Sequence, residues 1–392
     1  MTISASSIPR RHDLVRAEMR RLGIDALLVT HPSNIRYLTG FIGTAGALVI
    51  TERTCQLLVD FRYVTAAGDI AAGLPRGVVT VHAVDRSYDD AIIARLRESN
   101  AQRIGIEAAW LSVKRFNALS AGLASGAPLP LDRNVPCPVL VPTERIVERL
   151  RMIKDAVEVE TLREAGRRLS TIARDVADLV RDGRTELEIA ADLEAAIRGA
   201  GFSKPAFETI VASGPNSALP HARPGPRVLS AGDPVVLDFG GVYDGYCVDL
   251  TRTVQLGVPS PALERLYDAV DAAHRAAIKT VRPGVRPSAI DAAARGVLAA
   301  RGLADAFGHG TGHGLGLEVH EEPRISRETP GVPDDPIEPG MVFTIEPGAY
   351  VPGVGGVRIE DDVLVVAGGC ERLTEAPSLM RAAGAGARGS EY

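Results

Sequence analysis

The stretch "DPVVLDFGGVYDGYCVDLTRTV", residues 233–254, places two largely apolar strands around a Tyr-Asp-Gly turn, which is typical of a β-hairpin. Asp238 and Asp249 lie on its two arms, eleven positions apart. In a hairpin with an even loop, an odd separation places both residues on one face, with Cα atoms roughly 5–8 Å apart. Two carboxylates aimed at one point repel each other, and strands disfavour aspartate. The hairpin therefore predicts a cation between them, although either aspartate alone would be an ordinary solvated residue.

Two glutamates occur in apolar segments near the end of the chain. Glu346 lies in "FTIEPG" and Glu360 in "VRIEDD", and we expect both segments to be strands. A charged glutamate inside such a strand is normally paired or bound to a metal. Either glutamate alone would be read as an edge residue. With the two aspartates, they form a set of four carboxylates.

The segment "FGHGTGHGLGLEVHEE", residues 307–322, adds three histidines among five glycines. His309 and His313 have the spacing of a helical metal pair, but each glycine would cost roughly 1 kcal/mol inside a helix. The glycines instead predict an extended backbone that another group approaches closely. The segment is thus expected to contribute a histidine ligand to the carboxylate set.

Such a set of oxygen and nitrogen donors suits two divalent ions, Mn²⁺ most naturally, with Co²⁺ or Zn²⁺ as alternatives. Two ions about 3.5–4 Å apart can hold a bridging hydroxide as nucleophile and polarise a carbonyl group. The sequence therefore predicts a hydrolase with a dinuclear metal centre.

The composition excludes several other classes of function. A net charge of -5 gives no electrostatic reason to bind nucleic acid or an anionic membrane. The four cysteines are scattered and form no CxxC pair, which fits a reducing compartment. No apolar run has the length of a signal peptide core or of a membrane span. We therefore expect a cytoplasmic protein.

A length of 392 residues suggests two domains. Residues 1–142 alternate helical and strand patterns, which predicts a compact α/β domain. Within it, the Pro-rich passage 128–142 is expected to be an irregular linker. The overall class predicted is α+β.

Residues 143–380 are expected to form the second domain. It begins with a helical run over 144–183 and continues with a helix in which Thr185 is the N-cap and Glu188 completes a capping box. Strands and two further helices follow. Residues 381–392 are expected to be a disordered tail.

The motifs that hold these candidate ligands resemble those of a known family, the pita-bread metallopeptidases, which include aminopeptidase P, prolidase and methionine aminopeptidase. The resemblance runs from about residue 150 to 370 and rests on "LDFGGVYDGYCVDLTRT", "GHGTGHGLGLEVHE", "TIEPG" and "GVRIEDD". It implies a C-terminal pita-bread fold, a curved antiparallel sheet covered by helices. The segment "SNIRYLTGFIGTAGALVI" similarly resembles a creatinase-like N-terminal domain.

The resemblance also implies a role for each of five ligands. Asp238 would bind one metal as a bidentate ligand, and His313 would bind the other. Asp249 and Glu360 would bridge the two ions, and Glu346 would ligate and also transfer the proton. All five positions hold the residue type that the family uses.

Four other residues match positions of the family's site. His221 would contact the substrate, and His320 would contact the scissile peptide and stabilise the tetrahedral intermediate. His309 would orient the metal-binding histidine. Arg358, two residues before Glu360, matches the site arginine. Taken alone, each histidine is more often a loop or packing residue.

The N-terminal domain disfavours a methionine aminopeptidase, and the intact carboxylates disfavour creatinase. The remaining reaction is cleavage of the Xaa–Pro bond in peptides with proline in second position, whose nitrogen carries no hydrogen. An Xaa-Pro aminopeptidase is preferred here, with an Xaa-Pro dipeptidase as the alternative.

The choice depends on a cation that would hold a dipeptide's carboxylate, for which Arg62, Arg223 and Arg358 are candidates. A homodimer is also implied by the resemblance. A non-peptidase binding module is disfavoured because all five ligands are kept. A nucleotide-dependent oxidoreductase is disfavoured because the glycine-rich stretch "GHGTGHGLG" contains no GxGxxG and follows no clear βα pattern.

Overall fold

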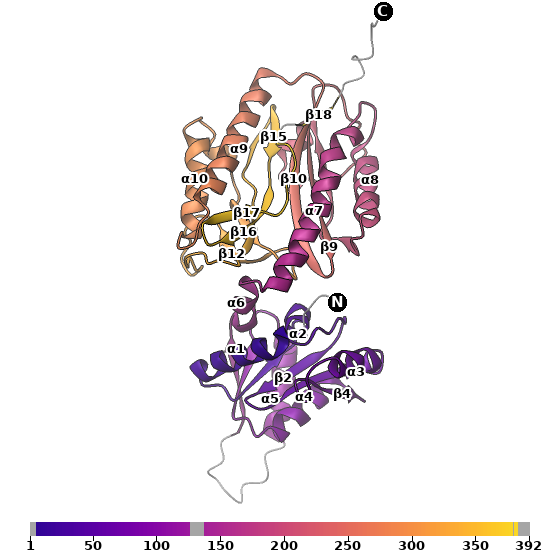
Figure 1. Cartoon of the computed structure of the whole chain (residues 1–392), viewed down its shortest axis with the longest axis vertical. Coiled ribbons are helices and arrows are strands. Elements are labelled where there is room, and N and C mark those ends of the chain that lie inside the picture. Colours follow the sequence, from indigo (N-terminus) through magenta and orange to yellow (C-terminus); the bar gives the residue numbers. More distant parts are fainter. Residues whose placement is uncertain (1–4, 126–136, 379, 383–392) are drawn as a thin grey trace, which may run out of the picture. The chain divides into compact units, whose positions relative to one another are not determined.

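A computed structural model describes residues 5–125, 137–378 and 380–382 (Figure 1). The chain divides into two compact units, Met1–Arg151 and Met152–Tyr392. None of the helices in these described ranges combines the length and the apolar content that a membrane span requires.

The first unit ends at Arg151, whereas the sequence analysis placed the boundary after position 142. The nine residues in between, 143–151, include all but the last residue of the helix α6, Ile146–Met152, whose Ile146 and Val147 are buried. Arg151 donates a hydrogen bond from Nη1 to Asn34 Oδ1 at 2.8 Å in the interior of this unit. These contacts keep α6 with the N-terminal unit.

The N-terminal unit is built on a six-stranded mixed sheet in the order β4-β3-β2-β1-β5-β6. Its strands are β1 Ala26–Val29, β2 Ala47–Thr51, β3 Cys55–Asp60, β4 Thr80–Val84, β5 Arg103–Glu107 and β6 Val139–Thr143. Its other helices are α1 Ser7–Leu22, α2 Pro32–Thr39, α3 Val64–Ala72, α4 Tyr88–Glu98 and α5 Val113–Ser125.

The expected linker over 128–142 is wrong at its C-terminal end, because β6 pairs in parallel with β5 from Val139 to Thr143. Proline is tolerated there, since β6 is an edge strand with only one partner. Residues 128–136 of the passage lie outside the described part of the chain.

The second unit contains two halves with the same general plan, a helix pair and a five-stranded sheet. The first half has the sheet order β18-β10-β9-β7, with β8 also paired to β9. Its elements are α7 Ala156–Leu179, α8 Glu186–Gly199, β7 Lys204–Pro205, β8 Ile210–Ser213, η1 Gly214–Ala218, β9 Pro234–Tyr243, β10 Tyr246–Leu256 and β18 Met380–Ala382. The predicted capping box is present: Thr185 accepts from Glu188 N, and the Glu188 side chain accepts from Thr185 N.

The second half has the sheet order β12-β11-β13-β16-β17 and a separate hairpin, β14-β15. Its elements are α9 Pro261–Thr280, α10 Pro287–Ala299, η2 Ala304–Ala306, β11 Gly312–Gly314, β12 Glu321–Ile325, β13 Val342–Ile345, β14 Gly348–Val351, β15 Gly355–Arg358, β16 Asp361–Val366 and β17 Gly369–Arg372.

The predicted disordered tail is wrong for Arg381 and Ala382, which belong to β18 and pair in parallel with β10. Residues 383–392 of that tail lie outside the described residues.

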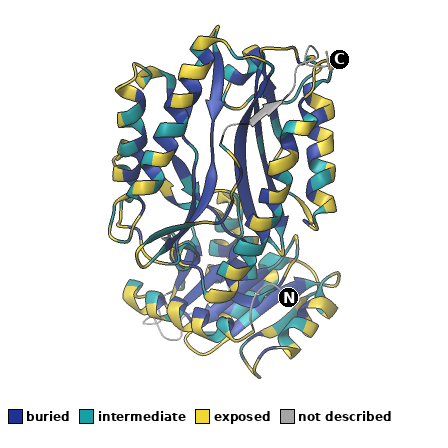
Figure 2. Cartoon of the chain, turned by 45° about the horizontal axis from the view of Figure 1, so that its top comes forward, coloured by how far each residue is buried: buried dark blue, intermediate teal, exposed yellow. Residues whose placement is uncertain are grey.

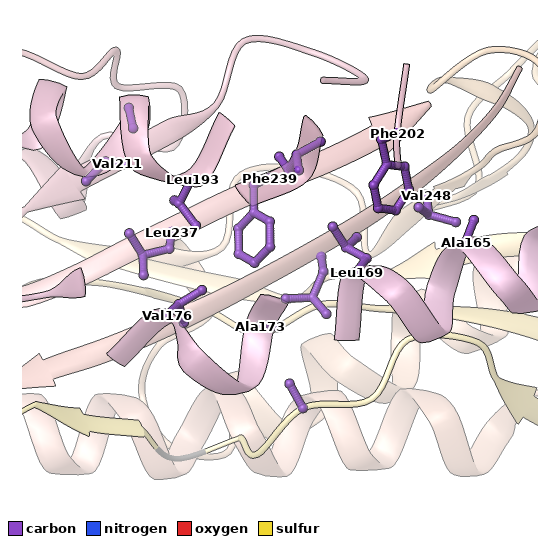
Figure 3. Close-up of a cluster of buried hydrophobic side chains, with 14 of the residues drawn as sticks. Ala165, Leu169, Ala173, Val176, Leu193, Phe202, Val211, Leu237, Phe239 and Val248 are labelled. Carbon is purple, nitrogen blue, oxygen red and sulfur yellow. The ribbon is translucent and has the colours of Figure 1, made fainter. Parts of the chain in front are cut away.

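Each half of the second unit has its own apolar core. In the first, Leu169 and Ala173 of α7 pack with Phe239 of β9 (Figure 3). In the second, α9 and α10 pack with strands such as β13 and β16. The central strands are buried while the helices keep exposed outer faces (Figure 2). Buried strands enclosed by helices hold the groups that project from them in fixed positions.

Candidate metal centre and substrate-binding residues

The hairpin β9-β10 has the predicted geometry. Asp238 lies opposite Thr251, and Asp249 lies opposite Gly240. The two aspartates are therefore diagonal neighbours on one face. Asp249 is buried and Asp238 is partly exposed. The first half thus presents two carboxylates from one regular hairpin.

His313 lies in the short strand β11, which is extended as predicted. A Cβ on Gly312 would stand 1.9 Å from Thr344 O, and one on Gly314 would stand 2.1 Å from Glu322 O. The groups that approach the glycines are therefore the backbones of neighbouring chain segments. His313 Nδ1 donates to Gly314 O at 3.0 Å, which leaves Nε2 with a free lone pair.

The two glutamates lie at breaks between strands and not inside strands as expected. Glu346 follows β13 and precedes β14, and Glu360 lies between β15 and β16. Glu360 is held by an isolated bridge to Thr251, which donates from Oγ1 to Glu360 Oε2 at 2.6 Å. Glu346 N donates to Thr311 O at 2.7 Å. At each break, the glutamate lies outside the regular strand pairing, while a hydrogen bond from its backbone N–H still fixes its position.

The candidate ligands converge from both halves. Asp249, His313 and Glu360 each offer a ligand atom, and these atoms lie within 4.8 Å of one another. Glu346 Oε1 lies 3.6 Å from His313 Nε2. Asp238 completes the group from the diagonal position on the hairpin.

The electrostatics of this group call for a cation. Burial, and then the charge of Glu360, raises the pKa of Asp249 well above its ordinary range, and burial likewise raises that of Glu360. Burial raises the pKa of Glu346 to about 7 and lowers that of His313 to about 4. The imidazole is therefore neutral at pH 7, the form that binds metal.

Unpaired oxygens show that the donors fit divalent ions. Among the described residues, Asp238 Oδ1 and Asp249 Oδ1 are buried without a hydrogen-bond partner. A buried carboxylate oxygen without a partner is costly. A hard divalent cation among four carboxylates and one neutral imidazole would satisfy both oxygens.

Arg358 connects the aspartate of β9 to a second set of side chains. Its Nη2 bonds Asp238 Oδ2 at 2.5 Å, and its Nη1 donates to Tyr350 OH at 2.8 Å and to Pro220 O at 3.2 Å. His309 Nδ1 donates to Gly310 O at 2.8 Å, so its Nε2 accepts from Tyr350 OH at 3.0 Å.

His309 therefore reaches Asp238 through Tyr350 and Arg358. Within the described part of the chain, His309 makes no hydrogen bond or ring contact with His313, the residue that the resemblance expected it to orient. Burial lowers the pKa of His309 to about 4, which keeps the ring neutral. Sequence reasoning did not single out Tyr350, and its place in "EPGAY" gave no signal.

The two other histidines line the exposed side of the centre. The His320 ring centroid lies 4.2 Å from that of His313. His221 is exposed, and its charge contributes to lowering the pKa of His320, which burial lowers most. Both are accessible to a ligand that enters from solvent.

The three arginine candidates for a carboxylate-binding cation are already engaged. Arg62 pairs with Asp60 in the N-terminal unit at 2.8 Å. Arg223 pairs with Glu208 at 3.4 Å on the surface. Arg358 pairs with Asp238, as described above.

A fourth arginine was not anticipated. Arg324 of β12 lies directly opposite His313 in the β11-β12 pair, so both side chains project from the same face. It is exposed, and it is close enough to His320 to contribute to lowering the pKa of that histidine. The two-residue spacing of His320, Glu322 and Arg324 was the available signal that these residues share a strand face. The bulge in β11 shifts the register, so the sequence does not show which of them lies opposite His313.

Comparison with known proteins identifies the family of the chain. The model of metallopeptidase family M24 matches residues 160–367, and that of the creatinase/prolidase N-terminal domain matches residues 11–153. The chain belongs to metallopeptidase family M24. It is 32% identical to a protein named Xaa-Pro dipeptidase from Pyrococcus horikoshii, over 91% of this chain and 94% of that relative.

Solved structures similar to this M24 metallopeptidase include proteins with either of the two activities expected. An Xaa-Pro dipeptidase from Bacillus anthracis has a TM-score of 0.87 at 34% identity, covering 95% of this chain and 99% of that one. An X-Pro aminopeptidase from Thermotoga maritima has a TM-score of 0.80 at 33% identity, covering 93% and 99%.

These comparisons confirm the predicted α+β fold, a pita-bread unit preceded by a creatinase-like N-terminal domain. They also confirm that the M24 chain is a hydrolase of the metallopeptidase type.

Proposed function

We propose that this M24 metallopeptidase is an Xaa-Pro dipeptidase. The sequence favoured an aminopeptidase and kept the dipeptidase as the alternative. Relatives named Xaa-Pro dipeptidase occur among both the similar sequences and the similar structures. They favour the alternative over the first choice.

Arg324 is the observation that carries this proposal. Its guanidinium makes no hydrogen bond or ion pair with any described residue, and it lies across from His313. A free guanidinium beside the reacting group is suited to the C-terminal carboxylate of a dipeptide, which lies one residue beyond the scissile bond. A longer peptide has an uncharged amide at that point.

The five ligands would be Asp238, Asp249, His313, Glu346 and Glu360, binding two divalent ions, with Mn²⁺ the first candidate. Bound there, the ions would supply Lewis acidity and an activated water. Asp249, His313 and Glu360 bring ligand atoms within 4.8 Å of one another, and Asp238 is the diagonal neighbour of Asp249 on the hairpin.

The protein's own groups would handle the protons. Glu346, whose Oε1 lies 3.6 Å from His313 Nε2, is suited by its place in the centre to take a proton from the attacking water and pass it to the leaving proline nitrogen. His320 and His221 would contact the substrate from the exposed side. Arg358 holds Asp238 and so fixes the orientation of that ligand.

The proposal includes the oligomeric state and the cellular location of the protein. The homodimer expected from the sequence and its cytoplasmic location would both suit an enzyme that removes dipeptides within a cell. Gel filtration with light scattering would test the dimer.

The proposal is tested by comparing Ala-Pro with Ala-Pro-Ala at a fixed Mn²⁺ concentration. We expect a higher kcat/KM for the dipeptide. A preference for the tripeptide would instead assign the aminopeptidase activity. Full activity after chelation would contradict both the dipeptidase and the aminopeptidase assignment.

A further inference from the structure

A fully buried carboxylate lies at the start of α8, outside the metal centre. Glu186 is 0% exposed, and it is the first residue of the helix. A buried glutamate needs several donors to offset its lost hydration. The identity of those donors suggests what it does.

All of the donors belong to one segment, residues 213–225, which we term the His221 loop. Ser213 donates to Glu186 Oε1 from both N and Oγ at 2.7 Å. Asn216 donates from Nδ2 to the same oxygen at 3.1 Å. Gly225 N donates to Oε2 at 3.0 Å. One carboxylate thus holds both ends of the loop.

The backbone of α8 reinforces this closure. Leu187 N donates to Gly225 O at 3.3 Å, and Glu186 N donates to Arg227 O at 3.1 Å. Arg227 in turn donates to Ser213 Oγ at 2.6 Å. Fixing both ends of a loop restricts what lies between them.

The loop carries two groups that lie close to the candidate site. His221 lies between the fixed ends, and its charge is felt by both His309 and His320. The carbonyl of the preceding Pro220 accepts from Arg358 at 3.2 Å, and Arg358 also binds Asp238. The loop therefore has a third attachment beside the metal centre.

We propose that Glu186 is a positioning residue that holds the His221 loop so that His221 reaches the substrate. This inference rests on the proposed function in one respect, the contact between His221 and the substrate. Glu186 itself touches neither the ligands nor the substrate in this account.

The first experiment is a double-mutant cycle with Glu186→Gln and His221→Ala, measured as kcat/KM for Ala-Pro. An amide at position 186 sets an N–H against a loop donor, which would displace the loop. We expect Glu186→Gln to lower kcat/KM by about 10- to 100-fold, because small misplacements of catalytic groups have effects of this size. Glu186→Gln should cause little further loss of kcat/KM in the His221→Ala background, because both substitutions remove the same contribution, that of a correctly placed His221.

Glu188→Gln is the matched control, since it replaces a carboxylate by an amide in the same helix turn without touching the loop, and the amide oxygen can still accept from Thr185 N. It should change the melting temperature little and leave kcat/KM unchanged. Full activity of Glu186→Gln, or losses that multiply when it is combined with His221→Ala, would overturn the proposal.

A second measurement needs no reaction and so separates this inference from the proposed function. In chelated protein labelled with ¹⁵N-histidine, the ring resonances of His221 should move in Glu186→Gln and stay in place in Glu188→Gln. If Glu186→Gln fails to fold, Asn216→Ala removes only one side-chain donor and should produce a smaller shift of the same resonances. Unmoved His221 signals in the loop variant that folds would refute the positioning role, whatever the substrate is.

Discussion

The two halves of the catalytic unit supply the metal centre in different ways. The first half provides Asp238 and Asp249 from one continuous hairpin with a regular register. The second provides His313 beside a bulge, and Glu346 and Glu360 from breaks between strands. A regular ladder fixes side-chain direction by its two-residue period, whereas a break must be held by individual hydrogen bonds.

The difference teaches where each half is vulnerable. In the first half, a ligand can be replaced without disturbing the backbone that carries it. In the second half, the position of His313 depends on close backbone contacts. Gly312 packs against the backbone of Thr344, and Gly314 packs against the backbone of Glu322. His313 N also donates to Thr344 Oγ1. The following predictions test this contrast, from the largest expected effect to the smallest.

Asp249→Asn should abolish metal binding and hydrolysis while the hairpin still folds. The amide keeps the shape of the side chain but removes the charge at the centre of the ligand group. Metal content by mass spectrometry and hydrolysis of Ala-Pro would measure this. Asp244→Asn, at the exposed turn of the same hairpin, is the matched control and should bind metal normally; equal metal content in the two variants would contradict the assignment.

Arg324→Ala should lower kcat/KM for Ala-Pro by about 10- to 100-fold, the loss expected for a hydrogen bond to a charged group. Hydrolysis of Ala-Pro-Ala should change little, because that peptide offers no carboxylate at this point. Arg327→Ala removes an exposed arginine three residues later and serves as the control. Equal losses for both peptides would show that Arg324 does not select dipeptides.

Gly312→Ala should destabilise the protein by about 1–3 kcal/mol, because the new Cβ would meet Thr344 O and the strands would have to separate. Gly308→Ala, in the same segment, meets nothing within 4 Å and should change the free energy of unfolding far less. Urea denaturation of the chelated proteins measures both. If the two variants are equally stable, close approach does not explain the glycines of β11.

Chelated protein should become less stable as the pH rises from about 4.5 to about 7. The pKa of Glu346 is raised from 4.5 to about 7 by burial, so the folded form holds a proton that the unfolded form releases in this range. The stabilisation is present below the lower value and is lost through the upper one. Melting temperatures at pH 5 and pH 8 would show a decrease of a few degrees, and Glu346→Gln should reduce it without removing it, because the raised pKa values of Asp249 and Glu360 act in the same direction. A chelated protein with the same melting temperature at both pH values would contradict this account of Glu346.

The sequence was most informative where the structure is periodic. The shared face of Asp238 and Asp249 followed from a two-residue period, and the capping box at Thr185 followed from its own spacing. Glu346 and Glu360 were expected inside strands, because an apolar run does not show where a ladder is interrupted.

Arg324 was missed for a related reason. Its position opposite His313 depends on a pairing register shifted by a bulge, which only the folded chain defines. The strand β6 was likewise hidden by prolines that an edge strand accepts. What could not be predicted were contacts between segments far apart in the chain, such as those of Glu186 with the His221 loop.

The short strand β18 has a consequence for self-association. It runs beside Val254, Gln255 and Leu256 of β10 and occupies the outer hydrogen-bonding groups of that strand. A chain shortened before Met380 would present those groups to solvent as a free template for another molecule. Such a truncated protein should be prone to edge-to-edge aggregation even with every catalytic group intact.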